Sequence, residues 1–289
     1  KDVGGGFGAK NSMYCEQALV VWTARLLGRP VKWVGQRSDA FITDFHGRDN
    51  MTHAELALDQ DGKFLGLLVD ETANLGAYIS GRGAIPPVLN QPALAGTYQT
   101  PAIHVRVRGM FTNTVPTDVY RGAGRPEAIY LLERLIDKAA DELNIDRVEL
   151  RRLNIIPADA FPYKTPLGLT YDGGLFERNL DEGLRRIDWE GMELRRAEAK
   201  ARGTRRGIGL ANYVERSGHG VTQDATLRVG HDGGVTVLIG TMSNGQGHET
   251  AYAQIAAELL GLDPDQVEVI QGDTDLIAQG KGTGGSWSI

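Results

Sequence analysis

Apolar side chains recur three and four positions apart in several stretches of the chain, the spacing typical of amphipathic helices. This pattern predicts helices over residues 13–27, 126–143 and 248–260, with a further short helix ending near RRLNIIP. Ser12 is predicted to cap the first helix at its N-terminus, and Gly28 with Pro30 to end it.

Shorter apolar or alternating runs between these helices predict strands. In the first half they are VKWV, THAELALD, FLGLLVDET and HVRVRGMF, and the turn DQDGK predicts a hairpin between the second and third. In the second half they are RGIGLANYV, the longer stretch DATLRVGHDGGVTVLIG, and QVEVIQG. Helices and strands in this order predict an α+β fold with mixed sheets and packed helices.

A change of composition divides the chain. Residues 158–205 combine a segment rich in proline and glycine with a charged helical stretch, which is typical of a surface connector. We therefore expect a first domain over residues 1–157, a helical connector over 158–205, and a second domain over 206–289.

Overall composition excludes several classes of protein. The formal net charge of −6 argues against nucleic-acid binding, and the longest apolar run is too short to cross a bilayer. We expect a cytoplasmic protein that binds neither nucleic acid nor membrane. Cys15 is the single cysteine, so this chain cannot supply the thiolates of an iron–sulfur cluster.

Glycine is the unusual residue, at 38 of 289. It gathers in short loops, several of which lead directly into a predicted helix and would offer unpaired N–H groups to an anion. GGGFGAKN fails as a P-loop, because Ala9 and Asn11 replace a required glycine and hydroxyl. It also lacks the third glycine of a dinucleotide motif, although Arg37 after VKWVG keeps an NADP site as a less favoured alternative.

Other catalytic motifs are missing. HETAY has Tyr252 where a zinc-binding helix needs histidine, and no other grouping of histidine and carboxylate has the spacing of metal ligands. We therefore assign no metal ligand to the chain. The loops GGGFG, VYRGAGRPE, TMSNGQGHET and GKGTGGSWS are each explained by an ordinary turn, but together they indicate one elongated polar ligand.

These loops also carry a family resemblance. VGGGFGAK, VYRGAGRPEAIYLLERLIDKAADELNIDRVELRRLN, GTMSNGQGHETAYAQIAAELLG and VIQGDTD with GTGGSWS occur in this order. In them the chain resembles the molybdenum-cofactor-binding large subunit of the xanthine dehydrogenase, aldehyde oxidase and carbon monoxide dehydrogenase family. The resemblance implies molybdopterin cytosine dinucleotide with molybdenum, and oxidation of a carbon centre with oxygen from water.

The resemblance also implies roles for particular residues. Arg121 would lie in the metal pocket as the catalytic residue of this chain. The residues that would bind the cofactor are Gly6, Phe7, Gly8, Gly245, Gln246, Gly247, His248, Thr283, Ser286 and Ser288. Of these, Thr283, Ser286 and Ser288 would hold the dinucleotide phosphates.

Departures from the family pattern narrow the expected substrate. Asn11 and Ala123 stand where purine-oxidising members carry a glutamate and a phenylalanine, which argues against xanthine and places both residues in the substrate pocket. Gly122 stands where copper-dependent CO dehydrogenases carry a cysteine, which argues against CO. An aldehyde or an N-heteroaromatic substrate remains.

Family large subunits are longer than this chain and carry a general-base glutamate in a C-terminal motif that this chain lacks. We therefore expect an internal portion of a larger subunit, with its second domain incomplete at the C-terminus and inactive alone. Separate iron–sulfur and FAD subunits would remove the electrons. The alternative is a cofactor-free scaffold of the same fold.

Overall fold

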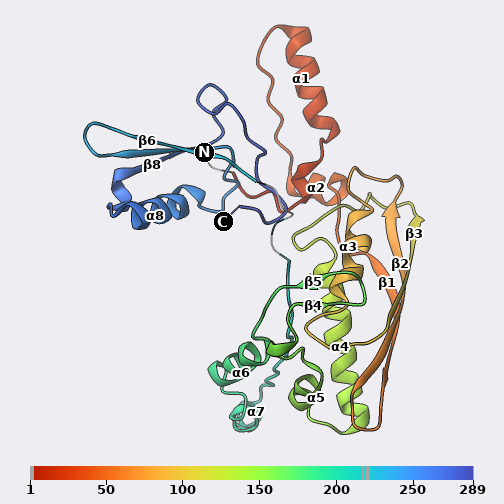
Figure 1. Ribbon diagram of the computed structural model, residues 1–289. Helices are drawn as coiled ribbons and strands as arrows, with labels where there is room; N and C mark the ends of the chain where they lie inside the picture. The colour runs from red at the N-terminus through yellow and green to blue at the C-terminus, as the bar shows by residue number, and fades with distance from the viewer. Residues whose placement is uncertain (1–2, 217, 219–221, 289) are drawn as a thin grey trace. The chain divides into compact units, whose positions relative to one another are not determined.

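The computed structural model describes residues 3–216, 218 and 222–288 (Figure 1). The chain forms two compact units. Lys1–Asn11 and Arg216–Ile289 make up one, here called the split unit, and Ser12–Glu215 make up the other, the central unit. The predicted connector over residues 158–205 thus lies within the central unit, and the first eleven residues group with the C-terminal part of the chain.

A three-stranded sheet and the helices on one of its faces organise the central unit. Strand β1 (Asn50–Leu58) pairs antiparallel with β2 (Phe64–Gly76), and β2 pairs parallel with β3 (Ile103–Phe111). The predicted β1–β2 hairpin is confirmed: the Asp59 carboxylate accepts from the backbone N–H groups of Asp61 and Lys63 and closes the turn. Mixed pairing with packed helices confirms the α+β prediction.

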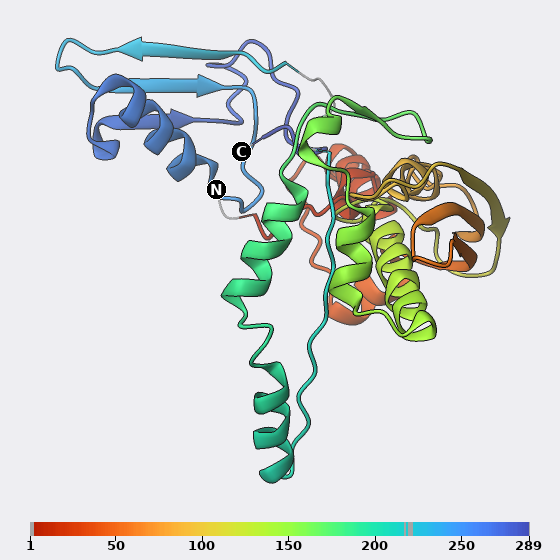
Figure 2. The same cartoon turned by 60° about the horizontal axis from the view of Figure 1, so that its bottom comes forward.

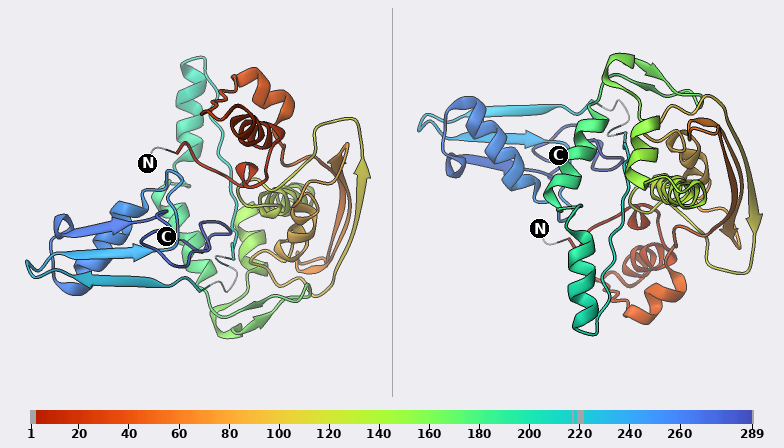
Figure 3. Two further views of the ribbon diagram at one scale, coloured as in Figure 1. Left: turned by 90° about the horizontal axis from the view of Figure 1, so that it is seen from above. Right: turned by 90° about the horizontal axis from the view of Figure 1, so that it is seen from below.

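The hydrophobic core of the central unit lies between this sheet and three helices. These are α3 (Ile85–Ala93), α4 (Arg125–Leu143) and α5 (Arg147–Asn154), and α3 and α4 lie along one sheet face (Figure 3). The predicted stripe of α4 is confirmed, since Leu132 and Ile136 are buried. Burial of such side chains stabilises the fold by about 1.5–3 kcal/mol each.

The segment predicted as a surface connector contributes to this core. It holds β4 (Tyr163–Lys164), β5 (Thr170–Tyr171), α6 (Phe176–Arg186) and α7 (Met192–Ala201). Leu180 of α6 is buried in the same cluster as the sheet and α4. The charged composition describes the outer faces of these helices, and their few apolar residues attach them to the unit.

Tyr171 gives this region a measurable pH dependence. Its hydroxyl donates to the Gly96 carbonyl at 2.9 Å, and burial, followed by the nearby Tyr163, raises the pKa of Tyr171 to about 12. Because the unfolded chain ionises near pH 10, this group stabilises the fold fully below pH 10, and the contribution is lost as pH rises through about 12. We expect Tyr171→Phe to flatten the alkaline loss of thermal stability, measured by unfolding between pH 9 and 12. A wild-type slope in the variant would contradict the assignment.

The first helix differs from its prediction at its start. Helix α1 (Cys15–Leu27) begins after Tyr14, not Ser12, and the Tyr14 N–H is accepted by the Gln17 side chain. Ser12 instead donates to the Asp118 carboxylate at 3.2 Å, so it is not the N-cap. Gly28 ends the helix in the left-handed conformation as predicted, with φ of 63°.

Two predicted strands are wrong. VKWV (residues 31–34) precedes the short helix α2 (Arg37–Thr43) and has no strand partner among the described residues. Residues 206–214 are also irregular, because their backbone groups bond to side chains and not to a neighbouring strand. Glu133 accepts from the Asn212 N–H, and Arg151 donates to the Leu210 carbonyl. The apolar runs were read correctly as extended chain and wrongly as sheet.

The split unit is a small sheet with one crossing helix. Strand β6 (Ala225–Val229) pairs antiparallel with β7 (Val235–Ile239), and β7 pairs parallel with β8 (Val267–Ile270). Helix α8 (His248–Leu260) connects β7 to β8 and packs on one face of the sheet (Figure 2). The predictions of α8 and β8 are confirmed, and the predicted strand-rich stretch before α8 forms two strands, β6 and β7. The short helices η1 (Ala9–Asn11), η2 (Ala158–Ala160) and η3 (Pro264–Gln266) complete the described elements.

Candidate cofactor-binding site

The β7–α8–β8 connection brings chemistry-bearing loops to one edge of the split unit. In a parallel pair joined by a helix, both strands end at the edge where the helix begins, and ligands bind there. Here the loop from Thr241 to Gly247 follows β7, and the loop from Gln271 to Ser288 follows β8. The candidate residues of the C-terminal half therefore gather at one end of one sheet.

The loop after β7 holds its shape through glycine conformations and one side chain. Gly245 has φ of 112° and Gly247, the N-cap of α8, has φ of 76°, both in the region that favours glycine. The Gln246 amide oxygen accepts from the Asn244 backbone N–H. The loop thus exposes Gly245, Gln246 and Gly247 beside the positive end of a 13-residue helix dipole.

The N-terminal glycine loop lies directly against this one. A Cβ atom on Gly245 would lie 2.8 Å from the Val3 carbonyl oxygen and 3.6 Å from the Gly5 nitrogen. Gly5, Phe7 and Gly8 all have positive φ, and the exposed Phe7 ring is held by a left-handed backbone. Two glycine loops more than 200 residues apart in the sequence thus form one surface.

The loop after β8 also approaches the backbone closely. A Cβ on Gly240 would lie 2.4 Å from the Gly280 Cα, and the Gly282 N–H donates to the Gly240 carbonyl at 3.1 Å. The Thr283 hydroxyl accepts from the Met242 N–H at 3.0 Å and lies 3.4 Å from the Ser288 hydroxyl. Since Thr283 accepts both bonds, its own proton is free to be donated to an anion.

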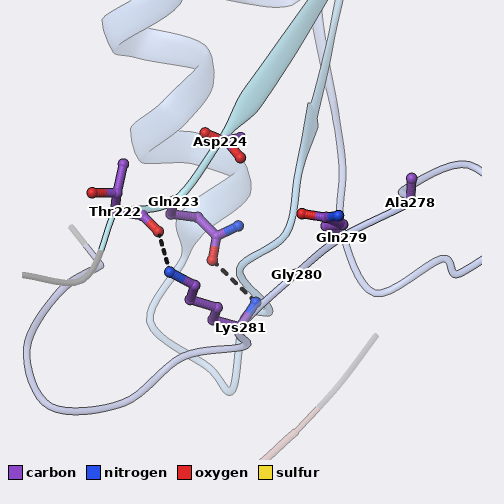
Figure 4. A pocket seen from close by; sticks show the side chains of 7 residues that line it. All are labelled: Thr222, Gln223, Asp224, Ala278, Gln279, Gly280 and Lys281. Carbon is purple, nitrogen blue, oxygen red and sulfur yellow. Dashed lines mark hydrogen bonds between the residues drawn. The ribbon is translucent and has the colours of Figure 1, made fainter.

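A polar cavity of about 440 Å³ adjoins this loop (Figure 4). The residues lining it are Thr222, Gln223, Asp224, Ala278, Gln279, Gly280 and Lys281. The Lys281 ammonium donates to the Thr222 carbonyl at 3.0 Å, and the Gln223 amide oxygen accepts from the Lys281 N–H at 3.2 Å. The cavity therefore joins the segment before β6 to the segment before Thr283. Sequence analysis missed it, and the charged Lys281 between two glycines was the available signal.

His248 differs from the other predicted contacts because its side chain is fully buried. Its Nδ1 lies 3.2 Å from the Gln271 amide oxygen, and its ring packs against Tyr252 at 5.2 Å between centroids. Thr241 lies 3.4 Å from the same Gln271 oxygen and 3.3 Å from the Tyr252 hydroxyl. Thr241 and Gln271 were not among the predicted site residues, although Thr241 directly follows one predicted strand stretch and Gln271 lies near the end of another.

The remaining predicted residues lie on two different units. Arg121 is exposed in the central unit, where its carbonyl accepts from the Arg48 guanidinium. Gly122, Ala123 and Gly124 follow with φ of 90°, 47° and 97°, so a left-handed turn precedes α4. Asn11 ends η1 in the split unit. Its pairing with Ala123 in a substrate pocket stays a prediction.

The open space around three glycines indicates whether a cofactor could lie against the backbone of these loops. A Cβ on Gly4, Gly247 or Gly282 would meet nothing within 4 Å, so each exposes backbone on an open face. Backbone N–H groups, the Thr283 hydroxyl and the start of α8 are donors suited to phosphate oxygens. The donor set therefore fits a polar, anionic cofactor.

Comparisons with known proteins agree with this geometry. Family models for the molybdopterin cofactor-binding domain match residues 1–155 and 182–289. The carbon monoxide dehydrogenase large chain of Hydrogenophaga pseudoflava is 36% identical over 99% of this chain and 38% of its own length. The subunit gamma of the 6-hydroxypseudooxynicotine dehydrogenase complex of Paenarthrobacter nicotinovorans is 32% identical over 99% of this chain and 36% of its own.

Among solved structures, quinoline 2-oxidoreductase from Pseudomonas putida 86 superposes with a TM-score of 0.89. It is 34% identical, and the match covers 98% of this chain and 38% of that one. The chain therefore belongs to the molybdenum-cofactor-binding large subunits of the xanthine oxidase family, as the motifs predicted. It spans little more than a third of the length of these relatives.

The comparisons do not support one exclusion made from the sequence. Gly122 argues against CO as substrate, yet a CO dehydrogenase large chain is 36% identical to this chain. Among the described residues, no three histidine, cysteine, aspartate or glutamate side chains gather as metal ligands would. In the same residues, no helix has the length and apolar character needed to cross a bilayer.

Proposed function

We propose that the split unit binds molybdopterin in its cytosine dinucleotide form, as part of a larger molybdenum hydroxylase subunit. The observation that supports this most strongly is the joining of the two glycine loops at Gly245 and Val3, beside the start of α8. Side chains at these glycines would hold a cofactor away from the backbone donors. When bound, the cofactor supplies the redox-active metal that accepts electrons from the substrate.

Each loop has a separate role in this proposal. Gly6, Phe7 and Gly8 lie beside the metal end, and Gly245, Gln246 and Gly247 hold the pterin. Thr283, Ser286 and Ser288 hold the phosphates with hydroxyl and N–H donors. Ser286, at φ of 59°, keeps this last loop in a conformation that turns backbone groups outward.

The polar cavity beside Thr283 supports the dinucleotide form of the cofactor. A cytosine offers an amino donor, a ring-nitrogen acceptor and a carbonyl acceptor; a carboxylate can accept from the amino group, and an amide can donate to the acceptors. Asp224 and Gln279 supply both kinds of group on the cavity wall, and Lys281 adds positive charge one step from the phosphate-binding loop. The cavity thus has the chemistry needed for the nucleotide end.

The proposed reaction is oxidation of an aldehyde or N-heteroaromatic carbon with oxygen from water. Two of the relatives described above are named for N-heterocyclic substrates or their derivatives. Ala123 leaves more room than a phenylalanine would, and Arg121 places a cation beside it as the candidate catalytic residue. Electrons would pass to separate iron–sulfur and FAD subunits, because Cys15 alone cannot hold a cluster.

The cofactor is tested by isolating the intact subunit from its own cells. We expect molybdenum and released CMP in equal amounts, close to one per subunit. Oxidation of quinoline, an aldehyde and CO with an artificial electron acceptor then identifies the substrate class. Absence of both molybdenum and CMP would favour the cofactor-free scaffold. Tight binding of NADPH would favour the reductase alternative, which has lost its predicted strand at residues 31–34.

Gln246→Ala tests the loop after β7. Removing the amide oxygen frees the Asn244 N–H and loosens the loop, at a cost of about 0.5–1.5 kcal/mol for one hydrogen bond. We expect molybdenum content to fall several-fold while the unfolding temperature stays close to the wild-type value. Gln279→Ala, in the cavity, tests the nucleotide end separately and should lower CMP and molybdenum together. Full retention in Gln246→Ala would remove this residue from the site.

A further inference from the structure

His248 stands where the sequence predicts a cofactor contact, and its environment indicates a different role. The ring is fully enclosed by the protein's own atoms, whereas Gly245, Gln246 and Gly247 immediately before it are exposed. A ligand lying on the loop would touch these three residues and not the imidazole. The conspicuous histidine of the motif is therefore placed behind the binding surface.

The hydrogen bonds around His248 have one consistent direction. The Gln271 amide oxygen only accepts, so Nδ1 of His248 carries its proton and donates across 3.2 Å. Thr241 donates to the same oxygen, and its own oxygen accepts from the Tyr252 hydroxyl. Two donors then meet at one acceptor, and every hydroxyl proton has a partner. Nε2 of His248 and the amide nitrogen of Gln271 are buried without a hydrogen-bond partner among the described residues, so Nδ1 makes the bond that holds the ring.

This network connects the three places that define the site. Thr241 follows β7, His248 begins α8, and Gln271 follows β8. Thr241 and Tyr252 are also buried, so water cannot replace their bonds without opening the unit. The four side chains thus fix both cofactor-binding loops to the start of the helix.

We propose that His248 is a positioning residue that acts through Nδ1 and Gln271, and does not touch the cofactor. The proposal rests on the proposed function for the identity of the ligand. Whether the Nδ1 bond orders the loop over residues 241–247 can be measured in the protein without identifying the ligand. The proposed role predicts which replacement of the ring preserves the site.

Asparagine and glutamine distinguish the two ring nitrogens. The asparagine amide nitrogen can occupy the place of Nδ1, and the glutamine amide nitrogen the place of Nε2. We expect His248→Asn to keep cofactor content within about twofold of wild type. His248→Gln and His248→Leu should lower it about five- to tenfold, the factor of one buried hydrogen bond. His231→Asn, in the exposed turn after β6, is the matched control.

The experiment uses the intact subunit with its partner subunits and has two further readouts. Amide hydrogen exchange over residues 242–248 should be faster in the Gln and Leu variants and unchanged in the Asn variant. Gln271→Leu removes the bonds from both His248 and Thr241, so it should lower cofactor content at least as far as His248→Leu while leaving the histidine in place. Because Gln271→Leu already lacks the His248 bond, the double variant should lose no more cofactor than Gln271→Leu alone. Thermal unfolding identifies any variant that fails to fold.

Several results would overturn the proposal. Retention in the Gln variant with loss in the Asn variant would mean that Nε2 contacts the ligand. Equal loss in the Asn and Leu variants, or full retention in all, would show that the Nδ1 bond does not order the loop. If the wild-type subunit itself carries no molybdenum, the proposed function fails. Hydrogen exchange still decides this inference, and unchanged exchange in His248→Leu would overturn it.

Discussion

Gly245→Val is expected to abolish cofactor loading while leaving the rest of the split unit folded. The added Cβ would lie 2.8 Å from the Val3 carbonyl oxygen, a distance that forces two backbone segments apart. At φ of 112° a valine is also strained, at a cost of about 1–3 kcal/mol. Both glycine loops form the proposed cofactor surface. Displacement of either loop would therefore remove backbone N–H donors from that surface.

The expected result is a fall in molybdenum content of more than about tenfold, the effect of some 1.4 kcal/mol or more on binding. Gly261→Ala is a matched control, since Gly261 has φ of 70° at the far end of α8 and open space around its Cβ position. It introduces backbone strain in the same unit without moving the loops. Equal loss of molybdenum in both variants would indicate general destabilisation, and full retention in Gly245→Val would refute the shared surface.

The periodicity of the chain was sufficient to predict the scaffold of this site. The alternation in VTVLIG, the helical spacing after His248 and the run QVEVI predicted β7, α8 and β8, because each element buries its apolar face against the others. A strand–helix–strand order then places the loops at one edge. The glycine spacing further indicated that backbone groups, not side chains, would form the surface.

What the pattern could not supply was pairing over long distances. Residues 31–34 and 206–214 are apolar enough for strands, but a strand needs a partner, and partners are not encoded locally. The segment at 206–214 is instead held by Glu133 and Arg151. The same limit applies to the surroundings of His248, because its bond to Gln271 joins residues 23 positions apart in the sequence, whereas the predicted cofactor contact of His248 stays a prediction.

The largest expected effect on stability comes from the buried ion-pair network around Glu133 and Arg151 in the central unit. Arg151 is fully buried in the central unit and donates to the Glu133 carboxylate at 2.8 Å, with Asp137 at 2.8 Å on its other side. The same carboxylate accepts from the Tyr98 hydroxyl at 2.6 Å, and burial raises the pKa of Tyr98 well above its usual value. Tyr98 therefore remains a donor across the working range of pH.

Glu133→Ala is expected to lower the free energy of unfolding by about 3–5 kcal/mol. The change leaves the buried Arg151 guanidinium without one of its two carboxylate partners, Glu133 and Asp137. It also frees the Tyr98 hydroxyl and the Asn212 N–H, so the segment that leaves the central unit loses an anchor. In a unit of this size such a loss lowers the unfolding temperature by roughly 10 °C. Denaturant and thermal unfolding measure it.

A double replacement separates the cost of an unpaired charge from the worth of the pair. Glu133→Leu with Arg151→Met removes both charges of the pair, and we expect it to be more stable than either single variant, because Asp137 still has Arg134 as a partner at 3.5 Å. Glu182→Ala is the control: Arg185 and Arg186 lower the pKa of Glu182 to about 2, yet the group lies at the surface and is screened by solvent. Its replacement should leave the free energy of unfolding close to the wild-type value, because exposed ion pairs are screened by water and salt. A Glu133→Ala effect no larger than this would show that solvent reaches Arg151 and that the network does not anchor the segment at Asn212.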